Sequence, residues 1–355
     1  MMRHRRALEA TAQAMVAEGK GLLAADESNS TMSKRLVATG VQSTSETRRR
    51  FRELLFTTPA APEHISGVIL YDETIRQTAF DGAPFPQLLA ARGLIPGIKV
   101  DTGAKPLAGA EGEWVTEGLD GLRERLLEYR ALGARFAKWR AVLAIGEGRP
   151  SRYCVSTNAH ALARYAALCQ QGGIVPIVEP EVLMDGQHSI DQSEEITGVA
   201  LRAVFAELLD QRVLLEGIVL KPNMVLSGYD CPRQASVAEV AERTVALLRR
   251  VVPAAVPGIA FLSGGQSDEA AAAHLNAMNR LGAAPWQLSF SYGRALQATP
   301  LTVWSGRESH VRQAQAALAH RARCNGEARF GRYTGELERS APGGVVATAT
   351  TPRAA

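Results

Sequence analysis

Short apolar runs alternate along the chain with longer stretches in which apolar residues recur every three to four positions. Eight of these runs are five to eight residues long and rich in Val, Ile and Leu, which is typical of buried parallel strands. Their last residues lie 28 to 45 positions apart, the length of a strand plus a crossover helix. The predicted strands are Leu22–Asp26, Gly67–Tyr71, Ile95–Asp101, Ala134–Arg140, Ile174–Glu181, Gly217–Lys221, Gly258–Ser263 and Trp286–Ser291.

Helical patterns occupy the intervals between the runs. Ser236 and Ser267 stand where helix N-caps are expected, and Gly133, Gly172 and Gly282 stand where helices are expected to stop. Eight strand–helix repeats favour an α/β fold with a single closed (β/α)8 TIM barrel over an open doubly wound sheet. The predicted helices are Ser45–Leu55, Leu119–Gly133, Asn158–Gln171, Ser193–Gln211, Val237–Arg250 and Asp268–Leu281.

The chain of 355 residues offers no linker long or polar enough to divide it. We therefore expect one catalytic barrel domain over residues 1–340. Residues 341–355 are small, polar and almost uncharged, and we expect them to form a mobile tail. No Gly-x-Gly-x-x-Gly follows the first strand and no Gly-x4-Gly-Lys-Ser/Thr is present, so the motifs give no sign of a nucleotide-binding domain.

Composition narrows the classes of partner. Charged residues make up 21% of the chain and hydrophobic residues 46%, a globular balance, and the formal net charge of +4 is too small to predict nucleic-acid binding. No apolar run approaches the ~18 residues that cross a membrane, and the basic N-terminus MMRHRRALEA lacks the apolar segment of a secretory signal. Four cysteines without close pairing indicate free thiols in a reducing compartment, so we expect a cytoplasmic protein.

Charged residues of both signs stand at the C-terminal ends of five predicted strands. Side chains two residues apart share a face of a strand, so each of these charges can point inward at the rim where barrels carry their active sites. A single charge at a strand end is most often a solvated loop residue, but a buried group of charges must pair and usually shifts pKa values. The residues are Asp26, Lys99, Asp101, Lys138, Arg140, Glu179, Glu181 and Lys221.

Lysine is scarce, which makes its placement informative. The chain has six lysines beside 34 arginines, and three of the six (Lys99, Lys138 and Lys221) belong to this group. Arginine keeps its proton and forms no imine, whereas a lysine amine with a lowered pKa can lose its proton and can form an imine. We expect Lys138, Arg140 and Lys99 to lower the pKa of Lys221, and the two glutamates to relay protons, which suits Schiff-base chemistry on a carbonyl substrate.

Two loops have the composition of phosphate anchors. Ser263, Gly264 and Gly265 follow the seventh strand and lead into a helix, while Ser291, Gly293 and Arg294 follow the eighth, and these two loops commonly bind phosphate in such barrels. After the first strand, Thr31, Lys34 and Arg35 follow at helical spacing and form a candidate second clamp; the alternative is a capped, solvated helix start. The seven histidines show no metal-binding spacing and none ends a predicted strand, so we expect no metal and no cofactor.

At these residues the chain resembles class I fructose-1,6-bisphosphate aldolase, over roughly Ala12 to Gly335. The resemblance implies a lyase that cleaves fructose 1,6-bisphosphate to dihydroxyacetone phosphate and glyceraldehyde 3-phosphate through a lysine Schiff base, without a metal, and assembles as a homotetramer. The motifs that carry it are LLAADES from Leu22, GIKVD from Gly97, GLDGL from Gly118, FAKWR from Phe136, IVPIVEPE from Ile174, LEGIVLKPNMV from Leu215, FLSGGQS from Phe261 and SFSYGRALQ from Ser289.

The resemblance also implies a role for each residue that matches the family's motifs. Lys221 forms the imine, Glu179 serves imine dehydration and proton transfer, and Glu181 supports the lysine network. Asp26 assists removal of the C4 hydroxyl proton, while Lys138 lies beside the carbinolamine and orients the substrate hydroxyls. Lys99 is carried over as an active-site electrostatic residue, and we expect both Lys99 and Arg140 to bind the substrate. The site of the 1-phosphate is matched by Ser263, Gly264, Gly265, Ser291, Gly293 and Arg294, and the far phosphate by Arg35, with Thr31 in place of a serine.

One departure concerns the C-terminus. Animal members end in a tyrosine that takes part in enamine proton transfer, whereas this chain ends Thr-Pro-Arg-Ala-Ala and its last tyrosine is Tyr333. We therefore expect cleavage to persist, with enamine protonation slower or served by another group. Two alternatives stay open at this point: another lysine-imine enzyme acting on a sugar monophosphate or transferring a ketol unit, and a non-catalytic scaffold that binds anions at its rim.

Overall fold

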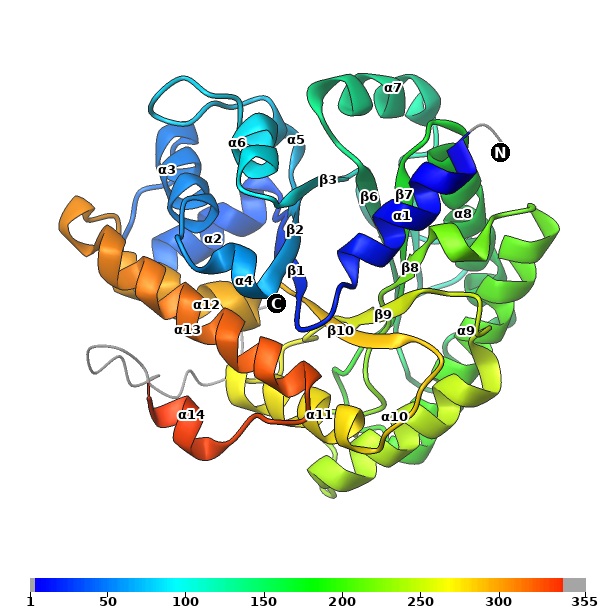
Figure 1. Cartoon of the computed structure of the whole chain (residues 1–355). Coiled ribbons are helices and arrows are strands. Elements are labelled where there is room, and N and C mark those ends of the chain that lie inside the picture. Colours follow the sequence, from blue (N-terminus) through cyan, green and yellow to red (C-terminus); the bar gives the residue numbers. More distant parts are fainter. Residues whose placement is uncertain (1–3, 341–355) are drawn as a thin grey trace.

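The computed structural model describes residues 4–340, and within them eight parallel strands close into a barrel in the order β1-β10-β9-β8-β7-β6-β3-β2 (Figure 1). The register joins Leu22 of the first strand to Ser291 of the last, which completes the ring. The predicted single barrel is thereby confirmed. The strands are β1 Gly21–Ala25, β2 Ile65–Leu70, β3 Ile95–Lys99, β6 Phe136–Leu143, β7 Val175–Val182, β8 Val219–Leu220, β9 Gly258–Phe261 and β10 Gln287–Tyr292.

Helices surround the barrel and connect successive strands. All six helices predicted from the sequence are present, although α8 begins six residues earlier than expected because Ser151 caps it. Ser236 and Ser267 cap α10 and α11 as predicted. The helices are α1 Arg5–Met15, α2 Asn29–Ala38, α3 Ser45–Phe56, α4 Ala61–His64, α5 Asp72–Ile75, α6 Phe85–Ala91, α7 Leu122–Leu132, α8 Arg152–Gln171, α9 Ile190–Asp210, α10 Val237–Val251, α11 Asp268–Arg280, α12 Arg294–Trp304, α13 Val311–Arg329 and α14 Gly335–Arg339, with 3-10 turns at Leu215–Gly217 and Glu308–His310.

Several elements were not predicted. The segment between β3 and α7 forms an antiparallel hairpin, β4 Gly103–Pro106 with β5 Trp114–Glu117, rather than a plain loop. The long helix α13 was missed because Arg321 and Arg329 lie buried on it, which breaks the expected stripe of apolar residues. Arg329 donates to main-chain carbonyls of Val16 and Leu288, so this buried arginine ties α13 to the barrel.

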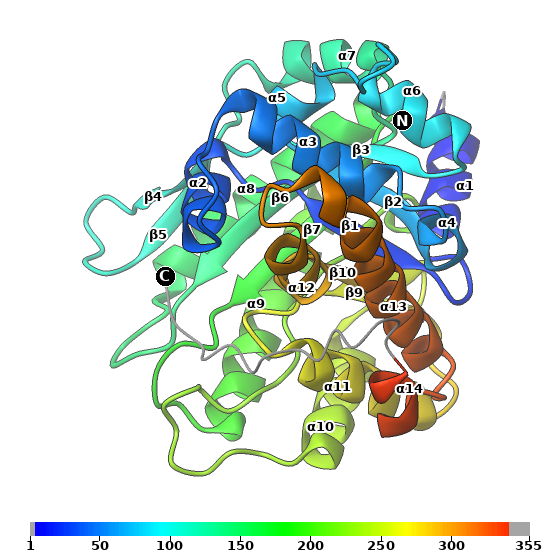
Figure 2. The same ribbon diagram turned by 90° about the vertical axis from the view of Figure 1, so that its left-hand side faces the viewer.

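The barrel interior is divided into an apolar layer and a charged layer. Inward residues near the N-terminal ends of the strands, such as Leu22, Phe136 and Val175, form one buried cluster with Leu8 and Met15 of α1. Figure 1 shows α1 lying across this end of the barrel, and Figure 2 shows α2 and the β4–β5 hairpin at the opposite end. The charged side chains follow the apolar ones along the same inward faces, so they open only toward the end opposite α1.

Other expectations concern the thiols, the membrane and the tail. Cys154, Cys169, Cys231 and Cys324 are all free cysteines, as the sequence indicated. Within residues 4–340 no helix combines the length and the apolar character that crossing a bilayer requires. The mobile tail predicted for residues 341–355 lies outside the described residues, so that prediction and the domain boundary at 340 remain predictions.

Candidate active site

Four predicted residues from four strands converge inside the barrel. The Lys138 Nζ atom lies 3.1 Å from Asp26 Oδ2 and 3.1 Å from Glu179 Oε2. The Lys221 Nζ atom lies 3.4 Å from Glu179 Oε1, the other oxygen of the same carboxylate. All four residues are buried, and Lys221 is 3% exposed. The alternation of side chains along the strands therefore brings the predicted amines and carboxylates together as one chain of charges.

The strand ends explain how Lys221 reaches this point. Strand β8 ends at Leu220, yet the Lys221 N–H donates to the Val178 carbonyl of β7 at 2.8 Å, so its backbone still follows the barrel wall. Val219, two residues earlier, belongs to the interior apolar cluster, so Lys221 continues the same inward face. The amine consequently stands above the apolar layer rather than among the outer helices.

Burial is the main reason why the pKa of Lys221 is lowered from its ordinary value. Glu179 raises this pKa and Lys138 lowers it, each less than burial does. The prediction named neighbouring cations as the cause of the lowered pKa of Lys221, whereas burial is the larger cause and Lys138 contributes less. The Lys99 Nζ atom pairs with Asp101 Oδ1 at 3.0 Å, and the Arg140 guanidinium pairs with the Glu181 carboxylate, so both cations carry their own counter-charges.

The two groups beside Lys221 are held in their charged forms. Burial alone would lower the pKa of Lys138, but Asp26 and Glu179 outweigh it and raise that pKa above its ordinary value. Burial alone would raise the pKa of Asp26, but Lys138, Lys221 and Lys99 together lower it. The site thus pairs a protonated Lys138 with an ionised Asp26, while burial lowers the pKa of Lys221 and so shifts this lysine toward its neutral form. Such a division of pKa values is typical of an active site that forms an imine.

Residues predicted for the first phosphate anchor lie close together after β9 and at the start of α12. Gly264 and Gly265 have φ angles of +58° and +99°, which side chains rarely allow. A Cβ atom on Gly265 would lie 3.0 Å from Arg294 Nη2, so the loop after β9 and the start of α12 meet there. The Ser291 hydroxyl is buried without a hydrogen-bond partner among the described residues. Together with Ser263, these groups form a cradle of donors suited to an anion.

The second predicted anchor follows β1 at the start of α2. Ser28 caps this helix, and the Thr31 N–H donates to the Ser28 hydroxyl at 3.3 Å. Lys34 is exposed, whereas the Arg35 guanidinium pairs with the Glu27 carboxylate. The capped helix start is therefore real, and Arg35 is anchored beside the first strand by an acidic neighbour.

Sequence reasoning gave no role to three side chains that contact these anchors. Arg52 of α3 is buried and its Nη2 atom lies 3.1 Å from Glu27 Oε2, while the Gln297 Nε2 atom donates to Glu27 Oε1 at 2.8 Å. The Tyr229 hydroxyl donates to the Gly264 carbonyl at 2.9 Å. Arg52 and Gln297 stand in ordinary helical patterns and Tyr229 in a loop, so only the folded chain brings them to the site.

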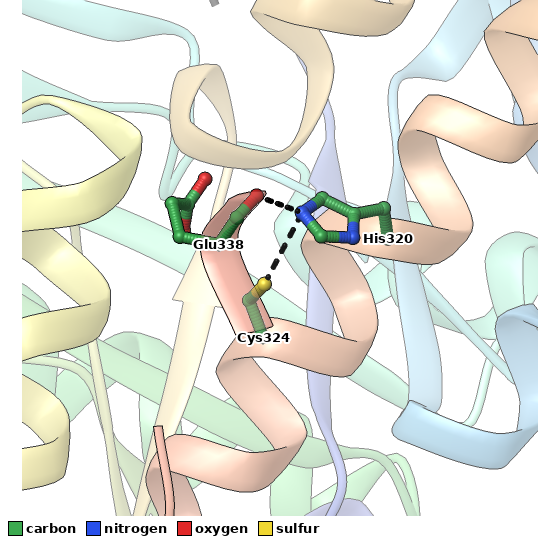
Figure 3. Close-up of side chains that lie close together, drawn as sticks. All are labelled: His320, Cys324 and Glu338. Carbon is green, nitrogen blue, oxygen red and sulfur yellow. Dashed lines mark hydrogen bonds between the residues drawn. The ribbon is translucent and has the colours of Figure 1, made fainter. Parts of the chain in front are cut away.

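A separate group of potential metal ligands lies on the outer helices: His320 and Cys324 on one face of α13, and Glu338 on α14 (Figure 3). The His320 Nε2 atom is 3.1 Å from the Glu338 main-chain oxygen. The Glu338 carboxylate already accepts from Arg321 and from the Tyr333 hydroxyl, and burial raises the pKa of the Cys324 thiol to about 11. A guanidinium on the carboxylate and a protonated thiol both oppose a cation, so we assign this group to the attachment of α14. The expectation that the reaction needs no metal stays a prediction.

Comparison with known proteins agrees with this geometry. A family model described as "Fructose-bisphosphate aldolase class-I" matches residues 7–349. The chain is 58% identical over 329 residues to "Probable fructose-bisphosphate aldolase class 1" of Xanthomonas campestris pv. campestris, covering 92% of this chain and 98% of that protein. It is 52% identical over 332 residues to "Fructose-bisphosphate aldolase" of Dictyostelium discoideum, covering 93% of each.

A solved structure is similar throughout the barrel. The fructose-bisphosphate aldolase from Plasmodium falciparum, in a ternary co-crystal with TRAP and a small-molecule inhibitor, has a TM-score of 0.91 and 48% sequence identity, covering 92% of this chain and 95% of that chain. With the family model and the relatives above, this likeness leads to one conclusion: the chain belongs to the class I fructose-bisphosphate aldolase family.

Proposed function

We propose that Lys221 forms the Schiff base in the reversible cleavage of fructose 1,6-bisphosphate to dihydroxyacetone phosphate and glyceraldehyde 3-phosphate, the reaction of this family. The observation that carries the proposal is a fully buried lysine amine 3.4 Å from a carboxylate oxygen, with a pKa below its ordinary value. A neutral amine is the form that attacks a ketone, and Lys221 is the buried lysine of the site for which burial favours that form.

The proposed sequence of steps uses the neighbours of Lys221. The Lys221 ammonium gives one proton to the Glu179 carboxylate, and the neutral amine attacks C2 of the open-chain sugar. Glu179 passes this proton to the C2 oxygen, then moves a second proton from the nitrogen to the resulting hydroxyl, and loss of water gives the iminium. The resulting iminium draws the electrons of the C3–C4 bond as the C4 hydroxyl proton leaves with the help of Asp26, which releases glyceraldehyde 3-phosphate. The remaining enamine takes up a proton at C3, and hydrolysis returns the amine and dihydroxyacetone phosphate. Lys138, held charged between Asp26 and Glu179, stabilises both carboxylates and orients the substrate hydroxyls.

The substrate is held by its two phosphates in this proposal. Ser263, Gly264, Gly265, Ser291, Gly293 and Arg294 bind the 1-phosphate, and Arg35 with Thr31 binds the far phosphate. The barrel wall between the two phosphate sites carries Lys99, Arg140 and Glu181. Each of the two cations is paired with a carboxylate. Fixing both ends of an open-chain sugar places its carbonyl over the amine, which is worth several orders of magnitude in rate.

Replacement of Lys221 tests the assignment directly. We expect Lys221→Met to lower the turnover of fructose 1,6-bisphosphate by at least ~10³-fold, because removing a nucleophile abolishes the covalent route. Lys105→Met is the matched control, since Lys105 is exposed on the β4–β5 hairpin. Turnover of the unsubstituted chain should be insensitive to a chelator. Full activity of Lys221→Met would contradict the proposal.

We also propose a homotetramer that works in the cytoplasm. The free thiols fit a reducing compartment, and a relative from Arabidopsis thaliana is named "Fructose-bisphosphate aldolase 6, cytosolic". Light scattering after size-exclusion chromatography measures the assembly, and a mass near that of one 38.0 kDa chain would contradict it.

A further inference from the structure

The loop that follows β9 is fixed through its carbonyl groups by two side chains. The Ser263 carbonyl accepts hydrogen bonds from the Gln266 side-chain Nε2 at 3.0 Å and from the Gln266 N–H at 3.0 Å. The next carbonyl, that of Gly264, accepts from the Tyr229 hydroxyl at 2.9 Å. Two consecutive peptide groups are therefore each held from one side by donors outside the proposed substrate site.

Peptide geometry converts these bonds into a direction for the N–H groups. In a trans peptide the C=O and the following N–H point in opposite directions. The Gly264 N–H must therefore point away from Gln266, and the Gly265 N–H must point away from Tyr229. Neither N–H donates to an acceptor among the described residues, and a Cβ atom on Gly265 would lie 3.0 Å from Arg294 Nη2, so a guanidinium lies close to this loop. Successive backbone N–H groups without an acceptor in the described part of the chain, next to a guanidinium, are the donors with which a backbone loop binds an anion.

Gln266 is itself held in one orientation. Its Oε1 atom lies 2.6 Å from His274 Nδ1, and because an amide oxygen only accepts, His274 must carry its proton on Nδ1. Burial lowers the pKa of His274 to about 4, so the ring stays neutral in the working range of a cytoplasmic enzyme. With its oxygen fixed by His274, the Gln266 amide can turn only its NH2 group toward Ser263.

Tyr229 reaches the loop from a different segment of the chain. It lies in the loop after β8, where its N–H donates to the Met184 carbonyl at 2.9 Å, and its side chain is 40% exposed. Partial burial raises the pKa of Tyr229 to about 12, so its hydroxyl keeps the proton that Gly264 accepts. The two supports of the loop, Tyr229 and Gln266, are therefore independent of each other.

We propose that Tyr229 and Gln266 are positioning residues for the 1-phosphate of the substrate: by binding the carbonyls of Ser263 and Gly264, they direct the N–H groups of Gly264 and Gly265 at that phosphate. This inference rests on the proposed function. It assigns the two residues to binding at one end of the substrate only, because within residues 4–340 neither side chain has a hydrogen bond to Lys221 or to Arg35, whereas both bind carbonyls of the loop after β9.

Condensation kinetics separate the two ends of the site. In that direction dihydroxyacetone phosphate occupies the 1-phosphate site and glyceraldehyde 3-phosphate the far site. Losing one orienting hydrogen bond should raise KM for dihydroxyacetone phosphate about 3- to 10-fold in Tyr229→Phe and in Gln266→Met, while KM for glyceraldehyde 3-phosphate and kcat change by less than about twofold. Tyr153→Phe is the matched control, since Tyr153 is an exposed tyrosine on α8.

The outcomes are distinct. A merely structural role would lower stability and raise both KM values together, and equal rises overturn the inference. An unchanged KM for dihydroxyacetone phosphate in Tyr229→Phe also overturns it, and because this variant loses a single oxygen atom, a folding defect does not obscure the result. Absence of condensation by the unsubstituted chain would overturn the proposed function as well, whereas an active chain with an unaltered Tyr229→Phe variant overturns this inference alone.

Discussion

Replacing Lys138 by methionine should remove the cation on which two buried carboxylates depend. Its amine is 3.1 Å from Asp26 and 3.1 Å from Glu179. At an effective dielectric constant of about 20, each contact is worth ~5 kcal/mol of Coulomb energy, most of which the cost of desolvation offsets. Breaking a buried pair of this kind typically lowers the free energy of unfolding by ~3–5 kcal/mol, so we expect a loss in that range near pH 7.5 for Lys138→Met.

The pH dependence of this loss has a definite sign. The pKa of Asp26 is lowered from 3.8, so its contribution to stability is present above that value and is lost as the pH falls through the lower folded pKa. The pKa of Lys138 is raised from 10.5, so its contribution is full below that value and is lost at higher pH. The stability difference between the unsubstituted chain and Lys138→Met should therefore be largest between about pH 5 and pH 10 and should shrink toward pH 3.

Urea unfolding followed by circular dichroism at several pH values measures this difference. Lys105→Met, which removes an exposed lysine, should change the free energy of unfolding by less than ~0.5 kcal/mol. If Lys138→Met were as stable as the unsubstituted chain near pH 7.5, or if its deficit did not vary with pH, the pairing of Lys138 with the two carboxylates would not be the stabilising contact argued here.

Three further predictions use other parts of the molecule. Arg35→Ala should raise KM for fructose 1,6-bisphosphate about 10- to 100-fold and hardly change KM for fructose 1-phosphate, because only the bisphosphate carries the far phosphate; equal effects would favour a different lysine-imine enzyme. The pKa of His274 is lowered to about 4, so the folded chain binds fewer protons than the unfolded chain between pH 6.5 and pH 4, and the free energy of unfolding should fall by ~3 kcal/mol over that range because of this residue. In His274→Leu, the free energies of unfolding measured at pH 7 and at pH 4 should differ by ~3 kcal/mol less than in the unsubstituted chain. Deleting residues 341–355 should change the turnover of fructose 1,6-bisphosphate little, and a large loss of activity would contradict that expectation.

The strands and the inward charges could be predicted from the sequence because both follow from simple periods. Alternation along a parallel strand requires Lys138, Glu179 and Lys221 to share the inward face with apolar residues two positions earlier, and the structure has them there. The eight strand boundaries differ from the predicted ones by at most three residues, as expected where strands fray into loops.

The pairing of the charges could not be predicted, because it depends on the conformation of each side chain and not only on which strands are neighbours. Arg140 of β6 lies beside Glu179 in the register but pairs with Glu181, and Lys99 pairs with Asp101 on its own strand end. In these two pairs a carboxylate neutralises Lys99 and Arg140, two of the cations that were expected to lower the pKa of Lys221. Burial is therefore the main cause of the lowered pKa. The contact of Tyr229 with the loop after β9 could not be predicted either, because the sequence around Tyr229 has no pattern that distinguishes it from a surface residue.

Borohydride trapping tests the central claim most directly. Incubating the chain with dihydroxyacetone phosphate and borohydride should reduce the imine and fix the ligand covalently, and peptide mass spectrometry should find the added mass on the peptide that contains Lys221, with none on Lys221→Met. Absence of any adduct, or an adduct on Lys99 or Lys138 instead, would contradict the assignment of Lys221 as the amine that binds the substrate carbonyl.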